Sequence, residues 1–281
     1  MPLIGSPSAF TGGVFAADGH FLADSIVERG QAGEWQEPVE HLPGTYIYGG
    51  CLFGHFGHFI LESLSRLYVV RSCKNYPILF INENDGAFDF QKDIFACLGI
   101  NNEIIRIKVP TSVEHLIYSK PGSVIEPLHI LDEQIDALKY FYFSKDVREE
   151  KIWLSRSNWL VGTIINEPAI EKILAKIGYT ILHPENLSFQ EQVRVISTSD
   201  IVAGFDGSQW YTLLFALEIT GKFHLFNRRP KIPDAVPYVL QKRKVAFTLH
   251  NFRVEYVCGE SAWSYYLHSE PEKIIDVLRC V

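Results

Sequence analysis

The residues best suited to bind phosphate lie between positions 151 and 216. Arg156 follows residues 151–155, an apolar run that is typical of a buried strand. A guanidinium group in that place offers two parallel N–H donors to phosphate oxygens and keeps its positive charge. We therefore predict that Arg156, with its neighbour Ser157, binds a diphosphate. An interdomain salt bridge is the alternative for the arginine.

A second candidate anion site follows the apolar run at residues 200–205. Asp206 and Gly207 lead into a helix that we expect to begin near Ser208 and to include Gln209. The free amides and the dipole of a helix start favour a diphosphate. Gly207 would let the backbone approach the ligand at positive φ, which a β-branched residue resists. Asp206 itself would repel a phosphate, so we expect it to cap the helix or to contact a sugar hydroxyl.

Two glutamates are candidates for the hydroxyl groups of a ribose. Glu185 follows the apolar run at residues 179–182, and Glu191 lies three residues after Ser188. The same spacing makes Ser188 and Glu191 a capping box, in which the two residues bond to each other at a helix start. Both interpretations are open for Glu191.

A separate group of chemically capable residues lies at positions 55–66. His58 precedes Glu62 by one turn of a predicted helix, and a histidine suits general-base work because imidazoles titrate near neutrality. Glu62 could orient the imidazole or act as the base itself, and Arg66 could pair with Glu62 one turn later. The alternatives are a buried or capping histidine and an ion pair on the helix surface.

The spacing of His55, His58 and Glu62 also imitates a metal site of two histidines and one carboxylate. The HExxH pattern is absent, and Gly54 and Gly57 favour a loop position for His55. We therefore predict that these residues bind no metal. A metal-dependent hydrolase is the competing enzyme class.

The elements that position these residues follow two α/β patterns. In the carboxyl-terminal half we expect a parallel βαβαβ unit, which places ligands at the carboxyl ends of its strands. Its strands are predicted at 151–155, 179–182, 200–205 and 222–226, and its helices at 168–177, after Ser188 and at 271–278. Asn166-Glu167 is interpreted as a turn, with a ligand contact as the alternative. In the other half we predict strands at 46–48, 77–81, 103–109 and 114–118, a loop at 49–57, and helices at 58–70, 90–98 and 131–143.

Composition and charge exclude several classes of protein. With a net charge of −7 the chain lacks the basic balance of a general nucleic-acid binder, so we expect no nucleic-acid partner. Its start lacks a signal-peptide pattern, and no run of about 18 apolar residues follows, which predicts a soluble, cytoplasmic protein. The basic clusters at 228–231 and 242–244 could contact the inner membrane peripherally. A solvated loop and a helix end are the alternative.

Cysteine and tryptophan positions favour packing over chemistry. The five cysteines form no CxxC pair and are typical of reduced thiols in the core of a cytosolic protein. Four tryptophans could stack on a base or a sugar ring, but buried packing is the expected role of each. We keep Trp210 alone as a stacking candidate among Trp153, Trp159, Trp210 and Trp263.

Four segments together resemble glycosyltransferase family 61, in the family's order: GHFILESLSRL, WLSRSN, NEPAIEKILAKIGY and PENLSFQEQVRVISTSDIVAGFDGS. The resemblance covers residues 57–71 and 151–216. It implies a GT-B-like fold, in which two Rossmann-type lobes face a cleft that holds the active site. With 281 residues and a polar run at 144–150, we expect an acceptor-side lobe at 1–145 and a lobe for the nucleotide sugar at 146–281.

The resemblance implies inverting transfer of a sugar from a nucleotide-activated donor to a glycan or lipid-linked glycan, in surface polysaccharide biosynthesis. His58 or Glu62 would remove the proton of the acceptor hydroxyl. Arg156 and the amides after Asp206 would stabilise the leaving diphosphate. With these donors present, and without a DxD motif in the sequence, we expect no cofactor and no requirement for Mg²⁺.

We also predict that His55 and Arg66 lie on the acceptor side, with a core or capping histidine as the alternative for His55. The resemblance contains one departure. The family usually reads His-Gly-Ala-Gly-Leu-Thr-Asn where this chain reads Asp-Gly-Ser-Gln-Trp-Tyr at 206–211. A catalytically inactive nucleotide- or glycan-binding protein of the same fold is therefore the alternative function.

Overall fold

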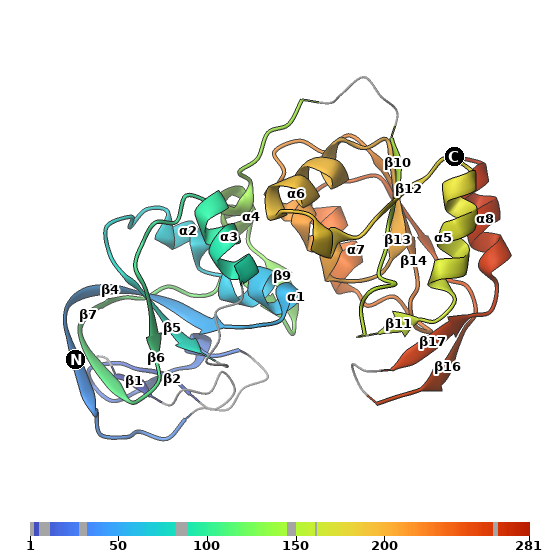
Figure 1. Cartoon of the computed structure of the whole chain (residues 1–281). Helices are drawn as coiled ribbons and strands as arrows, with labels where there is room; N and C mark the ends of the chain where they lie inside the picture. The colour runs from blue at the N-terminus through green and yellow to red at the C-terminus, as the bar shows by residue number, and fades with distance from the viewer. Residues whose placement is uncertain are drawn as a thin grey trace. The chain divides into compact units, whose positions relative to one another are not determined.

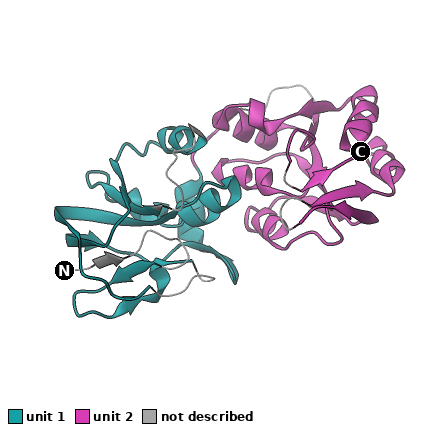
Figure 2. Ribbon diagram, turned by 60° about the horizontal axis from the view of Figure 1, so that its bottom comes forward, with its two compact units in different colours: residues 1–139 teal, residues 140–281 magenta. Residues whose placement is uncertain are grey.

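The chain folds into two compact units, residues 1–139 and 140–281 (Figure 2). The computed structural model describes residues 3–5, 12–27, 33–82, 89–144, 150–160, 162–260 and 264–281. Both units combine helices with parallel strands, which confirms the predicted α/β class. The GT-B arrangement and the roles of the two halves stay predictions.

Unit 1 is built on a seven-stranded sheet in the order β3-β2-β1-β7-β4-β5-β6 (Figure 1). Strands β7, β4, β5 and β6 are parallel, and β1, β2 and β3 add an antiparallel edge. The bounds are β1 Leu3–Gly5, β2 Gly13–Phe15, β3 Phe21–Leu22, β4 Glu40–Leu52, β5 Ile78–Asn82, β6 Ile104–Ile107 and β7 Thr111–Ile117. A separate hairpin is formed by β8 Ser123–Ile125 and β9 Leu128–Ile130.

Strand β4 is much longer than the predicted strand at 46–48. It finds hydrogen-bond partners on both sides, on β5 and on β7, so it continues through Gly49 and Gly50 to Leu52. Irregularities in register, one of them between Tyr48 and Gly50, accommodate the turn-forming residues within the strand. The predicted loop at 49–57 is therefore wrong over its first four residues.

The helices of unit 1 are short, and the predicted helix at 58–70 is broken. The carbonyl of Leu64 accepts a hydrogen bond from Gln134 Nε2 at 2.6 Å, and the carbonyl of Ser65 accepts one from the amide of Gly122 at 2.5 Å. Because partners outside the segment bind these carbonyls, the chain turns instead of continuing as one helix. The bounds are η1 Ala23–Ser25, α1 Phe56–His58, the π-helical η2 Phe59–Ser63, α2 Leu67–Val70, α3 Asp89–Cys97 and α4 Asp132–Leu138.

Unit 2 is built on a five-stranded parallel sheet in the order β12-β10-β13-β14-β15, which confirms the predicted parallel βαβαβ unit. The strands are β10 Lys151–Leu154, β12 Thr180–Leu182, β13 Ile201–Phe205, β14 Lys222–Phe226 and β15 Phe247–His250. The helices are α5 Glu167–Lys176, η3 Pro184–Asn186, α6 Phe189–Thr198, η4 Ser208–Phe215, α7 Ala235–Lys242 and α8 Pro271–Arg279. A second sheet contains β11 Thr163–Ile164, β16 Val254–Cys258 and β17 Tyr265–His268.

The sheet of unit 2 is buried on both faces. In β10, Ile152 and Leu154 pack into one apolar cluster with residues of α6, η4 and α7, whereas Trp153 packs into another with α5 and α8. Figure 1 shows α5 and α8 side by side on one side of this sheet, with α6 and α7 on the other. Apolar residues on both faces hold the strands rigidly, so the loops at their ends are well positioned.

The cysteines differ in their exposure to solvent. None of the five cysteines, all of which lie in the described parts of the chain, forms a disulfide; Cys51 is buried, but Cys258 and Cys280 are exposed, so the prediction of core thiols is wrong for these two. Among the described helices, none has the length and apolar character needed to cross a membrane.

Gln134 should be a strong determinant of stability in unit 1. Its side chain is fully buried, donates to the Leu64 carbonyl and accepts from the Tyr68 amide at 3.3 Å. We expect Gln134→Leu to lower the free energy of unfolding by about 1 to 3 kcal/mol, because the part-buried Tyr68 amide loses its partner and the Leu64 carbonyl keeps only its bond to the Leu67 amide. Chemical denaturation measures this loss. The exposed neighbour Glu133 is the control, since Glu133→Gln should change stability by less than about 0.5 kcal/mol; equal stability of the two variants would contradict the assignment.

Candidate functional site

Several charged residues of unit 2 lie in the loops that follow three neighbouring strands. Gly204 of β13 lies opposite Leu154 of β10 on one side and Leu225 of β14 on the other. Because these strands are parallel and in register, the loops that follow them leave the same edge of the sheet. The charged residues of these loops include Arg156, Asp206, Arg228 and Arg229.

Arg156 is held at this edge by two hydrogen bonds. Its Nη1 donates to Gln209 Oε1 at 3.0 Å, and Gln209 Nε2 in turn donates to the carbonyl of Phe205 at 3.0 Å. The backbone amide of Arg156 donates to Glu167 Oε1, also at 3.0 Å. The structure thus brings together Arg156 and Gln209, two residues that the sequence assigned to one site.

Gly207 is required by the position of Arg156 and not by a special backbone conformation. Its φ of 167° and ψ of 172° are extended, so the predicted positive φ is wrong. A Cβ atom at this residue would lie 2.5 Å from Arg156 Nη1 and 2.3 Å from Gln209 Oε1. Ser208 begins the next helix as predicted, but η4 is a 3-10 helix and not an α-helix.

Asp206 is 1% exposed and faces the loop after β14. Its Oδ1 accepts from the amide of Arg228 at 2.6 Å, and its Oδ2 lies 3.7 Å from Arg228 Nε and 3.8 Å from Arg229 Nη2. The prediction that Asp206 caps the following helix is therefore wrong, because its carboxylate binds two arginines instead. A contact with a sugar hydroxyl stays a prediction.

Sequence reasoning missed Arg228 as a site residue and treated residues 228–231 as a solvated loop or a membrane contact. The Arg228 side chain is only 13% exposed, and its Nη1 donates to the carbonyl of Gly162 at 3.4 Å. Its position could have been found, because the predicted strands at 151–155, 200–205 and 222–226 all end at the same edge if their sheet is parallel.

The arginines keep their positive charge although they are largely buried. Burial, followed by the charge of Arg228, lowers the pKa of Arg156 to about 10. Burial also lowers the pKa of Arg228, while Asp206 acts in the opposite direction. Both groups remain protonated at neutral pH. With Arg229 they outnumber the carboxylate of Asp206, so the immediate surroundings of Asp206 carry an excess of positive charge.

Glu167 accepts a hydrogen bond from the backbone amide of Arg156. The sequence indicated it mainly as a turn residue. It is 0% exposed, and its Oε1 accepts from Trp153 Nε1 at 3.1 Å as well as from the Arg156 amide. Burial raises its pKa to about 8, even though these donors favour the charged form. The carboxyl group is therefore mostly neutral at pH 7 and compensates the charge of Arg156 only in part, while Asp206 also favours the charged arginine.

The structure places the other predicted donor residues on neighbouring loops. Ser157 Oγ lies 2.9 Å from Ser155 Oγ and 3.3 Å from a carboxylate oxygen of Glu171. Glu185 lies in η3 and accepts from Trp159 Nε1 at 3.0 Å. Glu191 forms the predicted capping box with Ser188 at the start of α6. Ribose contacts of the two glutamates stay predictions.

The tryptophans differ from the prediction in two respects. Trp210 is fully buried and donates from Nε1 to the carbonyl of Phe205 at 2.9 Å, so it cannot stack on a ligand. Trp153 is also fully buried, as predicted. Trp159, which was expected to be buried, is 45% exposed. Trp263 lies outside the described residues.

In unit 1, His58 and Glu62 form the predicted pair. The imidazole Nδ1 is in hydrogen-bond contact with Glu62 Oε2. Glu62 is 7% exposed and His58 is 37% exposed, so the imidazole is the more accessible partner. His55 precedes α1 and is exposed; its ring centroid lies 5.1 Å from that of His58. The loop position predicted for His55 is confirmed.

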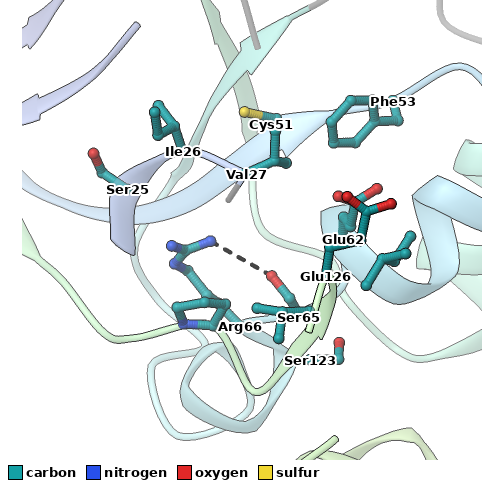
Figure 3. A pocket seen from close by; sticks show the side chains of 13 residues that line it. Ser25, Ile26, Val27, Cys51, Phe53, Glu62, Ser65, Arg66, Ser123 and Glu126 are labelled. Atoms are coloured by element: carbon teal, nitrogen blue, oxygen red, sulfur yellow. Dashed lines mark hydrogen bonds between the residues drawn. The ribbon is translucent and has the colours of Figure 1, made fainter. Parts of the chain in front are cut away.

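Arg66 does not pair with Glu62, contrary to the prediction. The break between η2 and α2 turns its side chain away: Nε donates to the carbonyl of Ser119 at 3.0 Å, and Nη2 donates to the carbonyl of Asp24. Figure 3 shows Arg66 and Glu62 in the wall of one pocket, with Arg66 on the side of Ser25 and Glu62 on the side of Phe53. Arg66 is thus a structural part of this pocket, and its acceptor-side role stays a prediction.

The described residues contain no group of three or more His, Cys, Asp or Glu side chains arranged to hold a metal ion. The spacing of His55, His58 and Glu62 therefore does not produce a metal cluster within this part of the chain.

Comparison with known families gives one match. The sequence pattern of the family described as Glycosyltransferase 61 matches residues 56–221, which is more than half of the chain. The matched range contains the His58–Glu62 pair, Arg156 and Asp206, whereas Arg228 lies beyond it. No curated protein matches the chain at a significant level.

Glu167 should make stability depend on pH. Its pKa is about 8 in the folded state, above the ordinary value of 4.5, so its contribution is complete at low pH and is lost as the pH rises through about 8. We expect the free energy of unfolding of the wild type to fall, relative to Glu167→Gln, by a few kcal/mol between about pH 5 and about pH 9. Denaturation at several pH values measures this difference.

The exposed Glu218 supplies the control for this series, because Glu218→Gln removes no buried carboxyl group. Parallel pH profiles for the wild type and Glu167→Gln would show that Glu167 is ionised in the folded protein at neutral pH.

Proposed function

The chain belongs to glycosyltransferase family 61, and from this premise we propose that it transfers a sugar from a nucleotide-activated donor to a hydroxyl group of a glycan or lipid-linked glycan. The observation that carries the proposal is the cluster of buried, protonated arginines at the carboxyl edge of a parallel sheet. Sheets of this type bind ligands at that edge, and guanidinium groups match the geometry of phosphate oxygens.

In the proposed reaction, Arg156 and Arg228 bind the diphosphate of the donor. Negative charge grows on the leaving diphosphate as the bond to the sugar breaks, and fixed positive groups in a partly buried site stabilise that charge. Gln209 bonds to the Arg156 guanidinium group, and Asp206 holds the backbone amide of Arg228 and lies beside its guanidinium group, so both side chains are positioned before the donor binds. These side chains supply the electrostatic stabilisation that Mg²⁺ provides in metal-dependent transferases.

We propose His58 as the base that deprotonates the acceptor hydroxyl and Glu62 as its positioning residue. A carboxylate at Nδ1 favours the tautomer with the proton on Nδ1, which puts the lone pair that would accept the proton on Nε2. The greater exposure of His58 supports this order of roles. Direct attack by the activated hydroxyl inverts the anomeric carbon. A role in surface polysaccharide biosynthesis and a cytoplasmic location, with peripheral membrane contact, are part of the same proposal.

Arg156→Lys tests the donor site, because lysine keeps the charge but lacks the planar pair of donors. We expect the affinity for nucleoside diphosphates to fall about 10- to 100-fold, the range for a lost charged hydrogen bond. Calorimetry with UDP, GDP, CDP and ADP measures it. The exposed Arg194 on α6 provides the matched control, since Arg194→Lys should bind as the wild type does. A folded Arg156→Lys protein with unchanged affinity would refute the assignment.

His58→Ala tests the base. We expect release of nucleoside diphosphate from a sugar nucleotide to slow by about 100-fold or more, with donor affinity unchanged. Added imidazole should restore part of the rate to His58→Ala but none to Glu62→Gln. If His58→Ala turns over normally and Glu62→Gln is inactive, the carboxylate is the base; if both are fully active, unit 1 does not supply the base. A wild-type protein that binds nucleotide without turnover would favour the inactive binding protein.

A further inference from the structure

Trp159 is an exposed aromatic residue that the surrounding chain nevertheless holds in place. Its amide donates to the carbonyl of Arg156 at 2.9 Å, and its own carbonyl accepts from Thr163 Oγ1 at 2.6 Å. The indole Nε1 donates to Glu185 Oε2 at 3.0 Å. The backbone and the ring are therefore both fixed, although 45% of the residue remains exposed.

Such an arrangement is typical of a ligand contact. A large ring gains free energy when it leaves water, and a ring that is already immobilised loses little conformational entropy when a ligand covers it. The indole N–H is satisfied by Glu185, so the remaining exposed surface of Trp159 is mainly apolar. A flat, uncharged partner fits this surface best.

The position of Trp159 relates this surface to the arginine site. Arg156 and Trp159 are the first and last residues of one turn. Gly162, three residues further on, accepts from Arg228 Nη1, and a Cβ atom at Gly162 would lie 1.7 Å from that nitrogen. The loop that carries Trp159 thus contacts the arginine cluster on both sides of the tryptophan.

The charge that surrounds this loop changes from positive at Arg156 to negative at the Trp159 ring. Near Arg156 and Arg228 the site is positive, whereas the Trp159 ring lies beside the carboxylate of Glu185. Close to the ring, Asn158 Nδ2 lies 3.1 Å from His183 Nδ1 and adds polar groups that can bind N–H and C=O edges. A second phosphate would be repelled beside Glu185, but an uncharged base and a ribose would not. A nucleoside diphosphate has the same sequence of charged and flat, neutral parts.

We propose that Trp159 is the platform on which the base of the donor nucleotide stacks. The inference rests on the proposed function, because it assumes that the arginine cluster binds the donor diphosphate. It adds the residue that recognises the rest of the leaving group.

The test compares two ligands on one set of variants. Calorimetry gives the affinities of the wild type, Trp159→Ala and Trp159→Phe for inorganic pyrophosphate and for the tightest of UDP, GDP, CDP and ADP. We expect Trp159→Ala to weaken the nucleotide about 5- to 100-fold and to leave pyrophosphate unchanged, whereas Trp159→Phe keeps most of the affinity. The control is Tyr256→Ala, at another exposed aromatic residue of unit 2, which should change neither ligand.

The outcomes separate the two claims. Unchanged nucleotide affinity in Trp159→Ala would overturn the stacking role while the donor site stands. An equal loss for nucleotide and pyrophosphate would also overturn it, because Trp159 would then only support Arg156. If pyrophosphate and every nucleotide fail to bind the wild type, both the donor site and the platform are refuted.

Discussion

Two guanidinium groups buried at one edge of a parallel sheet are the constraint on which the proposed donor site depends. Moving a charge out of water is costly; the charge of Arg228 lowers the pKa of Arg156 further, and that of Arg229 lowers the pKa of Arg228. Neighbouring groups offset this desolvation cost to different extents for the two arginines. Arg228 has the carboxylate of Asp206, but Arg156 has the neutral amide of Gln209 and a glutamate that is itself mostly protonated. The site therefore retains positive charge that a diphosphate can neutralise.

The positioning of these two arginines also accounts for the departure from the family pattern at residues 206–211, which follow β13. From the sequence, the acidic side chain of Asp206 seemed to oppose phosphate binding. In the structure it turns toward the loop after β14 and holds the amide and the side chain of Arg228. Gly207 is needed for a related reason, because any side chain there would displace Arg156. The altered segment is thus compatible with the proposed donor site, because its aspartate is turned toward an arginine.

Much of unit 2 could be predicted from the sequence, because its strands are short apolar runs separated by helices of regular period. Those runs placed Arg156 and Asp206 at the same edge, and the capping box of Ser188 was evident from its spacing. The partners of these residues could not be predicted. Nothing in the local sequence of Glu167 indicates that a distant strand would bury it, and the orientation of Asp206 depends on the loop after β14.

Unit 1 was harder to predict for the same physical reason. The period of residues 58–70 indicates one helix, but Gln134 and Gly122 bind carbonyls in its middle and break it. That break removes Arg66 from Glu62, whereas the contact between His58 and Glu62, within the first turns, survives. Residue spacing therefore predicted a side-chain contact correctly over one helical turn. It failed over the longer segment, where tertiary hydrogen bonds replaced those of the helix.

The central claim is that the edge formed by β10, β13 and β14 binds the diphosphate of the donor. A crystal structure of the full chain with the tightest-binding nucleoside diphosphate tests it most directly. We predict phosphate oxygens within hydrogen-bond distance of the Arg156 and Arg228 guanidinium groups. A nucleotide bound elsewhere, with these arginines still joined only to protein groups, would contradict the account.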